Sequence, residues 1–207
     1  MKLEEIVAAT SVMPVMVIDR LEEAVPLAQA LVAGGIRVLE ITLRTPAGLE
    51  AVKRIKQEVP DAIVGVGTIA TPQLLEASIK AGAAFGVSPG TPPALLKAIV
   101  DSGLPFFPGV ATMTEVMQVM DAGLTVMKFF PAVAAGGIKM LDSFAGPFPQ
   151  VGFCPTGGIN AANAADFFKL KNVVCVGGSW LTPKHLIAEG NWAGITQLAQ
   201  EAAALKP

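Results

Sequence analysis

Histidine, tyrosine and cysteine are scarce or missing in this sequence, which has one histidine, two cysteines and no tyrosine among 207 residues. A single histidine excludes a His-rich zinc site and most schemes of histidine acid–base catalysis. Cys154 and Cys175 lie far apart in apolar, strand-like segments, so their spacing fits neither a disulfide framework nor a metal site. We therefore expect buried, reduced thiols and no metal. His185 follows Thr182-Pro183-Lys184, which is typical of a helix start, so we expect it at the surface.

Charged residues are also few, at 15% of the chain, and the net charge is only −2. This near balance predicts no nucleic-acid partner and no electrostatic membrane partner. The mean hydropathy is high, at +0.57. However, Pro147, Pro149 and Pro155 interrupt the longest uncharged stretch, residues 143–165, which therefore cannot form a spanning helix. Residues 1–5 carry acidic side chains where a signal peptide needs a basic region. We expect a cytoplasmic protein.

What the chain does contain is a regular alternation of two kinds of segment, which follows a short amphipathic helix predicted at residues 2–9. Short β-rich apolar runs lie at Val12–Ile18, Val38–Leu43, Ala62–Ile69, Phe85–Val87, Pro105–Val110, Val126–Phe130, Gly152–Pro155 and Val173–Val176. Segments with helical periodicity lie between or after them, at 21–33, 47–58, 72–81, 92–101, 112–122, 137–144, 161–169 and 192–205.

This alternation predicts parallel strands, because each helix then serves as the crossover between two of them. The strands are nearly continuous apolar runs, as expected for a sheet that is covered on both faces. Eight such units most simply close into a small (β/α)8 TIM barrel, and we expect residues 1–207 to form one barrel domain. A doubly wound open sheet is the alternative. No Gly-x-Gly-x-x-Gly follows the first strand, which weakens that alternative.

Threonine–proline pairs and glycines mark the expected helix ends. Thr45-Pro46, Thr71-Pro72 and Thr91-Pro92 each offer a hydroxyl N-cap with proline at the first helical position. The helices should end at Gly34-Gly35, Gly82, Gly103 and Gly123.

Polar residues gather at the carboxyl ends of the predicted strands, where barrels of this kind place their chemistry. The period of two puts Glu40, Thr42 and Arg44 on one face of the second strand, and Lys128 and Phe130 on one face of the sixth. Thr68, Pro89 and Thr156 stand at three further strand ends. Glycine pairs follow the last two strands, at Gly157-Gly158 and Gly177-Gly178, where barrels often bind phosphate through backbone N–H groups.

Each of these residues also has a purely structural interpretation. Lys128 could extend its ammonium into water along its own stem, and Glu40 with Arg44 could form an internal ion pair. Their convergence at one end of the strands favours a catalytic site. Glu40 is the best candidate base, since no other carboxylate is expected at a strand's carboxyl end. A neutral lysine amine would be a nucleophile, which an apolar setting favours and a nearby carboxylate opposes; the sequence leaves this balance open.

The sequence resembles the 2-keto-3-deoxy-6-phosphogluconate (KDPG) aldolases, also called 4-hydroxy-2-oxoglutarate (KHG) aldolases, which are class I enzymes on a small (β/α)8 barrel. The resemblance extends from Pro14-Val15 to Gly190 and rests on several motifs together: Val38-Leu39-Glu40-Ile41-Thr42-Leu43-Arg44, Gly65-Val66-Gly67-Thr68, Ser88-Pro89-Gly90, Lys128-Phe129-Phe130-Pro131-Ala132, Phe153-Cys154-Pro155-Thr156-Gly157-Gly158 and Gly177-Gly178-Ser179-Trp180.

The resemblance implies a Schiff-base lysine at Lys128 and a general acid/base at Glu40. It implies that Arg44 and Thr68 hold the pyruvate carboxylate. The other implied substrate-binding residues are Pro89, Phe130, Thr156, Gly157, Gly158, Gly178 and Ser179, and the glycines and the serine form the phosphate end. It further implies a homotrimer that needs no cofactor.

Three questions stay open at this level. One is the preference between KDPG, which yields pyruvate and glyceraldehyde 3-phosphate, and 4-hydroxy-2-oxoglutarate, which yields pyruvate and glyoxylate. The other two are competing classes on the same fold. A phosphosugar isomerase or epimerase would use the phosphate site without an imine, and a non-catalytic barrel would only bind a phosphometabolite.

Overall fold

The computed structural model describes residues 1–205, so residues 206–207 of the predicted domain lie outside the described part. The strands are β1 (Val12–Met16), β2 (Val38–Thr42), β3 (Ile63–Gly67), β4 (Phe85–Val87), β5 (Phe106–Phe107), β6 (Gly109–Val110), β7 (Val126–Phe129), β8 (Gly152–Pro155) and β9 (Val176–Gly178). The helices are α1 (Leu3–Ala8), the 3₁₀ helix η1 (Leu21–Glu23), α2 (Ala24–Ala33), α3 (Gly48–Glu58), α4 (Pro72–Lys80), α5 (Pro93–Ser102), α6 (Met113–Asp121), α7 (Gly137–Ala145), α8 (Ala164–Phe167), α9 (Lys184–Ala188) and α10 (Trp192–Ala203).

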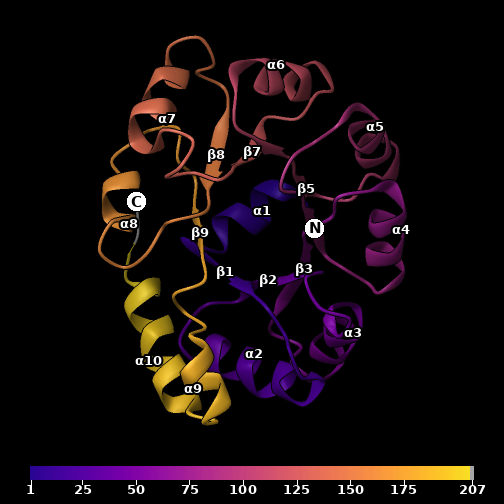
Figure 1. Ribbon diagram of the computed structural model, residues 1–207, viewed down its shortest axis with the longest axis vertical. Coiled ribbons are helices and arrows are strands. Elements are labelled where there is room, and N and C mark those ends of the chain that lie inside the picture. The colour runs from indigo at the N-terminus through magenta and orange to yellow at the C-terminus, as the bar shows by residue number, and fades with distance from the viewer. Residues whose placement is uncertain (206–207) are drawn as a thin grey trace.

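All paired strands run parallel, which confirms the α/β class predicted from the alternation. One sheet has the order β5-β4-β3-β2-β1-β9 and the other the order β6-β7-β8. Isolated parallel bridges join Phe153 to Val173 and Thr156 to Gly177, and so connect β8 with the chain at β9. Figure 1 shows the strands toward the centre and most helices around them. None of the helices within residues 1–205 is long and apolar enough to cross a membrane.

Two predicted strands are wrong in detail. Pro108 divides the predicted strand Pro105–Val110 into β5, which pairs with β4, and β6, which pairs with β7. Proline has no N–H to donate to a ladder, and its carbonyl accepts instead from Lys128 N at 2.9 Å. The last strand is β9 and not Val173–Val176, because Gly177 and Gly178 continue the ladder with β1. The glycine pair therefore lies within the strand.

The helix predictions need similar corrections. The Thr71 hydroxyl caps α4 as expected, by accepting from Leu74 N at 3.2 Å. The other two hydroxyls instead donate to carbonyls of neighbouring segments, Thr45 to Ile18 at 2.5 Å and Thr91 to Gly109 at 3.0 Å. The helix predicted at 161–169 is reduced to α8. The helix start before His185 is confirmed by α9, on which that side chain is exposed.

The buried apolar residues form two clusters. The larger lies between the strands and the outer helices. The smaller contains Phe85, Phe107 and both cysteines, and the two phenyl rings are 5.9 Å apart in an edge-on arrangement. Ile6 of α1 is completely buried in the smaller cluster. Figure 1 shows α1 near the centre of the molecule, among the labelled strands.

Cys154 and Cys175 are both free and buried in this cluster, and the pKa of one thiol is shifted. A hydrogen bond with Cys154, together with burial, raises the pKa of Cys175 well above its usual value. The unfolded chain loses this proton above about pH 8.5, whereas the native protein keeps it, so native stability falls as the pH rises. The loss approaches about 1.4 kcal/mol per pH unit until the native thiol itself ionises.

We therefore expect Cys175→Ala to lose less stability than the natural chain between about pH 7 and about pH 9.5. Urea unfolding at both pH values measures this difference. The comparison uses the change within each protein, because the alanine variant also loses packing at every pH. Equal alkaline losses in the two proteins would contradict the assignment.

Candidate active site

The central side chain of the candidate site is Lys128 on β7. Its backbone pairs with Gly109 of β6 and Cys154 of β8, so the strand fixes its position on both sides. The side chain is only 5% exposed, and Glu40, 88 residues earlier, is 2% exposed. Lys128 Nζ donates to Glu40 Oε1 at 3.3 Å. This is longer than the 2.7–2.9 Å that is usual for such charge-assisted bonds, so the pair is close without being tightly bound.

Phe130 lies beside the same amine. The Lys128 ammonium is 5.2 Å from the centroid of the Phe130 ring, within the range of a cation–π contact. Phe130 follows β7, and its backbone N–H donates to the Val110 carbonyl at 3.1 Å. The amine therefore lies between a carboxylate and an aromatic ring, in a setting that is almost closed to solvent.

Glu40 is held in the middle of β2, where it pairs with Val15 of β1 and Gly65 of β3. Its carboxylate lies over Gly67, two residues farther along β3. Thr42, which was predicted on the same face, donates its hydroxyl to the Met16 carbonyl at 2.8 Å. Thr42 thus connects two strands, while the carboxylate of Glu40 faces Lys128.

Thr68 directly follows β3 and is the one non-glycine residue within residues 1–205 that has a positive φ, of 65°. A β-branched residue in this left-handed region is strained, and such strain is concentrated at functional sites. The neighbouring backbone groups hold the turn, since Leu43 N donates to Gly67 O at 2.9 Å and Ile69 N to Val87 O at 3.1 Å. Thr68 is half-buried and directly follows Gly67, over which the Glu40 carboxylate lies.

Thr156 and the two glycines after it lie against the chain that follows β7. Thr156 is buried; its N–H donates to the Phe129 carbonyl at 2.9 Å and its carbonyl accepts from Ala132 N at 2.7 Å. Gly157 and Gly158 both have positive φ, of 101° and 79°, so the turn suits glycine. The turn therefore starts beside Phe130 and leads outward to the exposed Gly158.

Pro89 is exposed, and a polar link fixes the turn that contains it. The Ser88 hydroxyl accepts from Gly109 N at 3.0 Å, and the Thr91 hydroxyl donates to Gly109 O at 3.0 Å. Because Gly109 pairs with Lys128, this link connects the Pro89 turn to the strand that carries the amine. Strands β4 and β6 belong to different sheets, and the hydroxyls of Ser88 and Thr91 connect them through the backbone of Gly109. The sequence did not predict this connection.

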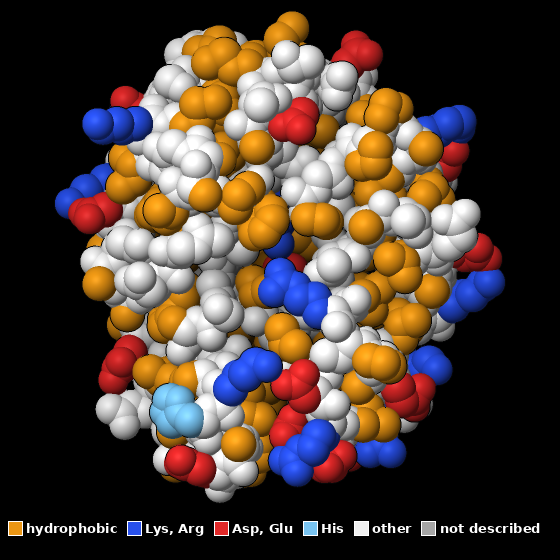
Figure 2. Space-filling view, viewed as in Figure 1, with side chains coloured by type: hydrophobic (Ala, Val, Ile, Leu, Met, Phe, Trp, Pro, Cys, Tyr) orange, Lys and Arg blue, Asp and Glu red, His pale blue; other side chains and the backbone are white. Residues whose placement is uncertain are grey.

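Arg44 and Ser179 lie in a cavity of about 630 Å³. Arg44 is exposed, and its guanidinium forms no hydrogen bond or ion pair with any other residue of 1–205. The cavity is also lined by Asp19, Arg20 and Lys184. Figure 2 shows basic side chains at the centre of this face, with mainly hydrophobic or uncharged side chains around them.

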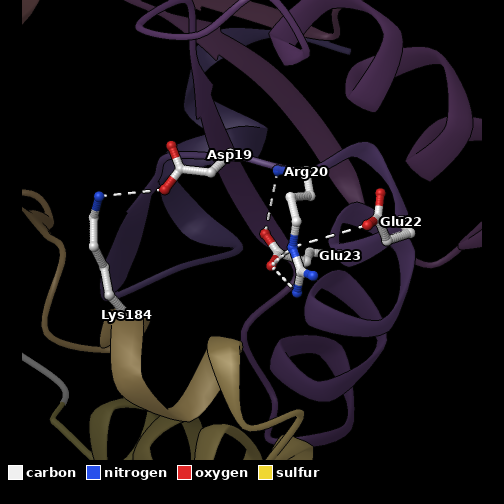
Figure 3. Close-up of polar contacts among 5 residues, drawn as sticks. All are labelled: Asp19, Arg20, Glu22, Glu23 and Lys184. Carbon is white, nitrogen blue, oxygen red and sulfur yellow. Dashed lines mark hydrogen bonds and ion pairs between the residues drawn. The ribbon is translucent and has the colours of Figure 1, made fainter.

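The cavity lining corrects one prediction, because Asp19 is a second carboxylate near the carboxyl end of a strand. It lies three residues after β1 and pairs with Lys184 at 3.2 Å, while Arg20 Nη2 pairs with Glu23 at 2.6 Å (Figure 3). Both cations thus have a carboxylate partner, whereas Arg44 has none among residues 1–205. Within the described chain, no three His, Cys, Asp or Glu side chains are placed to hold a metal ion.

Known proteins are similar to this chain in sequence and in fold. A sequence model of the family described as KDPG and KHG aldolase matches residues 3–198. The chain belongs to this family. A 2-dehydro-3-deoxy-phosphogluconate aldolase from Dickeya dadantii is 54% identical over 97% of this chain and 94% of its own length. A KHG/KDPG aldolase from Escherichia coli is 52% identical over 96% and 93%.

A solved member of the aldolase family has nearly the same fold. The KDPG aldolase from Legionella pneumophila superposes with a TM-score of 0.96 at 47% identity and covers 98% of each chain. Its crystal structure holds pyruvate captured at low pH as a covalent carbinolamine intermediate. A carbinolamine is the adduct of an amine with a ketone, so that aldolase uses amine chemistry on pyruvate.

Proposed function

We propose that this chain is a class I aldolase that forms an imine between Lys128 and a 2-oxo acid. The observation that carries the proposal is the buried amine of Lys128, 3.3 Å from the Glu40 carboxylate and beside the Phe130 ring. Burying this pair away from water is costly, and a nucleophile with an adjacent acid/base group gives the arrangement a purpose. The substrates are KDPG and, by the same chemistry, 4-hydroxy-2-oxoglutarate.

The reaction follows from the groups around the amine. Neutral Lys128 attacks the C2 ketone to form a carbinolamine, which loses water to give an iminium. Glu40 accepts the proton of the C4 hydroxyl while the C3–C4 bond breaks, and the electron pair moves toward the iminium to form an enamine. The aldehyde leaves, Glu40 returns a proton to C3, and water releases pyruvate and the free amine. Glyceraldehyde 3-phosphate or glyoxylate is the other product.

The remaining candidates bind the two ends of the substrate. In this proposal Thr68 and Arg44 hold the pyruvyl carboxylate and Phe130 lines the imine. The other substrate contacts are assigned to Pro89, Thr156, Gly157, Gly158, Gly178 and Ser179. The left-handed Gly157-Gly158 turn is a backbone conformation that suits an anion such as phosphate.

Arg44 and Ser179 line the same cavity, and Ser179 is assigned to the phosphate end of the substrate. The Arg44 guanidinium therefore has two candidate partners, the pyruvyl carboxylate and the phosphate. We expect Arg44→Ala to raise the KM for pyruvate-containing substrates about 10- to 100-fold, since hydrogen bonds to charged groups contribute about 1.5–3 kcal/mol. Arg44→Lys is the matched control, because it keeps the charge and loses the bidentate contact.

Free pyruvate decides between the two ends of the substrate. If Arg44 holds the carboxylate, Arg44→Ala weakens pyruvate binding as strongly as it weakens binding of the six-carbon substrate. The pyruvate concentration that half-saturates reductive trapping measures this effect. Unchanged half-saturation with a raised KM for KDPG would transfer Arg44 to the phosphate end.

We further propose that residues 1–207 form one closed (β/α)8 barrel domain with α1 as an additional N-terminal helix. The bridges between β8 and β9 and the Ser88–Gly109 bond across the other gap support closure. We propose a cytoplasmic homotrimer in which Ile79, Met113 and Met117 lie at subunit interfaces. These large side chains are 42%, 40% and 58% exposed on α4 and α6. The mass of the assembly in solution, from light scattering, tests this.

Borohydride trapping tests the proposed function. The protein is incubated with pyruvate, reduced, digested and analysed by mass spectrometry, and the expected product is a reduced pyruvyl adduct on Lys128. An adduct on another lysine would keep the reaction class and overturn the site. A folded protein without any adduct would overturn the imine and favour an isomerase or a phosphometabolite-binding barrel.

A further inference from the structure

Gly67 provides the space in which the Glu40 carboxylate lies. A β-carbon at Gly67 would be 2.1 Å from Glu40 Oε1 and 2.7 Å from its Cδ, distances that real β-carbons do not show. Gly67 does not have a positive φ, and it pairs with Thr42 in the ladder. Its strand conformation is therefore one that any residue can adopt. Its lack of a side chain is therefore needed for space.

Gly177 has the same relation to Thr156. A β-carbon there would be 2.3 Å from Thr156 Oγ1, and the two residues form the isolated bridge between β8 and β9. Gly177 also pairs with Met13 in an ordinary ladder. In both cases a strand glycine lies under a polar side chain of the neighbouring segment, and both side chains are buried candidates for the site.

Glycines elsewhere in the same strands serve the apolar interior instead. A β-carbon at Gly65 would be 2.3 Å from the Phe85 ring. Gly65 and Gly67 share one face of β3, because side chains alternate along a strand. The glycine nearer the carboxyl end thus accommodates a polar group, and the one below it accommodates a core ring. This difference provides a matched control within one strand.

We propose that Gly67 and Gly177 are positioning residues, which set the Glu40 carboxylate and the Thr156 hydroxyl by leaving room for them. The inference rests on the proposed aldolase function. A methyl group at Gly67 pushes the carboxylate away from its place, 3.3 Å from the Lys128 amine. A misplacement of about 1 Å can cost about 100-fold in rate, because proton transfer needs a fixed geometry.

The first test compares Gly67→Ala with Gly65→Ala. We expect Gly67→Ala to lower kcat by about 100-fold or more while the final yield of the pyruvyl adduct on Lys128 stays near that of the natural chain. Gly65→Ala should lower the melting temperature and keep the kcat of the folded protein within about threefold of the natural value. An unchanged kcat in Gly67→Ala, or an equal loss of kcat in both variants, would overturn the proposal.

A double-mutant cycle shows whether Gly67 acts through Glu40. In a Glu40→Gln background the base is already lost, so adding Gly67→Ala should change kcat by less than about threefold. A further 100-fold loss in the double variant would overturn the proposal. The proposed function fails separately, by the absence of a pyruvyl adduct in the natural chain.

Gly177 gives a second route if Gly67→Ala does not fold. Thr156→Ala removes the hydroxyl that a methyl group at Gly177 would meet. Gly177→Ala should therefore lower the melting temperature and kcat in the natural chain and lower both much less in the Thr156→Ala background, where the Thr156 β-carbon, at 3.2 Å, is the one atom of that side chain left near the new methyl group. Equal effects in both backgrounds would overturn the steric relation.

Discussion

Replacing Lys128 with alanine is expected to reduce cleavage by at least about 10⁴-fold and to abolish the pyruvyl adduct. The reason is that the amine is the proposed nucleophile, and the iminium formed from it is the electron sink for C–C cleavage, so the reaction has no route without it. The surrounding strands contain no second lysine within the interior, since Lys128 is the one buried lysine among residues 1–205. A coupled assay for pyruvate release measures cleavage, and borohydride trapping measures the imine.

Lys128→Ala also removes half of a buried ion pair, which has its own effect. Glu40 is 2% exposed and would lose its cationic partner, and breaking such a pair costs about 3–5 kcal/mol. Loss of activity in this variant alone could therefore reflect unfolding. Thermal unfolding must accompany the assay.

Lys128→Arg separates the two effects. Arginine keeps a cation beside Glu40 and stays protonated, so it cannot attack a ketone. We expect this variant to be as inactive as Lys128→Ala and to form no adduct, while its melting temperature is closer to that of the natural chain. Cleavage at the natural rate in either variant would refute the imine mechanism.

The fold class was predictable because its signals are local. Apolar runs and helical periodicity repeat along the chain, and parallel pairing follows from their alternation. The errors arise where a residue type such as glycine occurs both in turns and within strands. Gly177 and Gly178 were predicted to follow the last strand as a phosphate-binding pair, although they lie within β9. A glycine within a strand is required by the side chain of its neighbour, which the local sequence does not reveal.

The candidate site was predictable only as a set of residues at one end of the strands. That Lys128 and Glu40 would meet depends on β2 and β7, which are 88 residues apart and belong to different sheets. Strand order and curvature decide this distance, and no local pattern encodes them. Asp19 was missed although it directly follows the predicted strand Val12–Ile18, because its ion pair with Lys184, 165 residues later, depends on the fold and has no local signal.

Replacing Glu40 with glutamine is expected to lower kcat by about 10²- to 10⁴-fold, the usual contribution of a general acid/base. Glutamine has nearly the same shape, so it still fits over Gly67, and its amide oxygen still accepts from the Lys128 amine. What it loses is the ability to take up a proton. Imine formation on Lys128 should persist, because the nucleophile is intact.

Proton exchange isolates the step at which Glu40 acts. An aldolase that forms the enamine exchanges the methyl protons of pyruvate with deuterated solvent, which proton NMR follows without any aldehyde. We expect Glu40→Gln to slow this exchange by the same factor as kcat, since one carboxylate serves both the C4 hydroxyl and C3. Exchange at the natural rate together with slow cleavage would assign C3 protonation to another group and leave Glu40 only the hydroxyl proton.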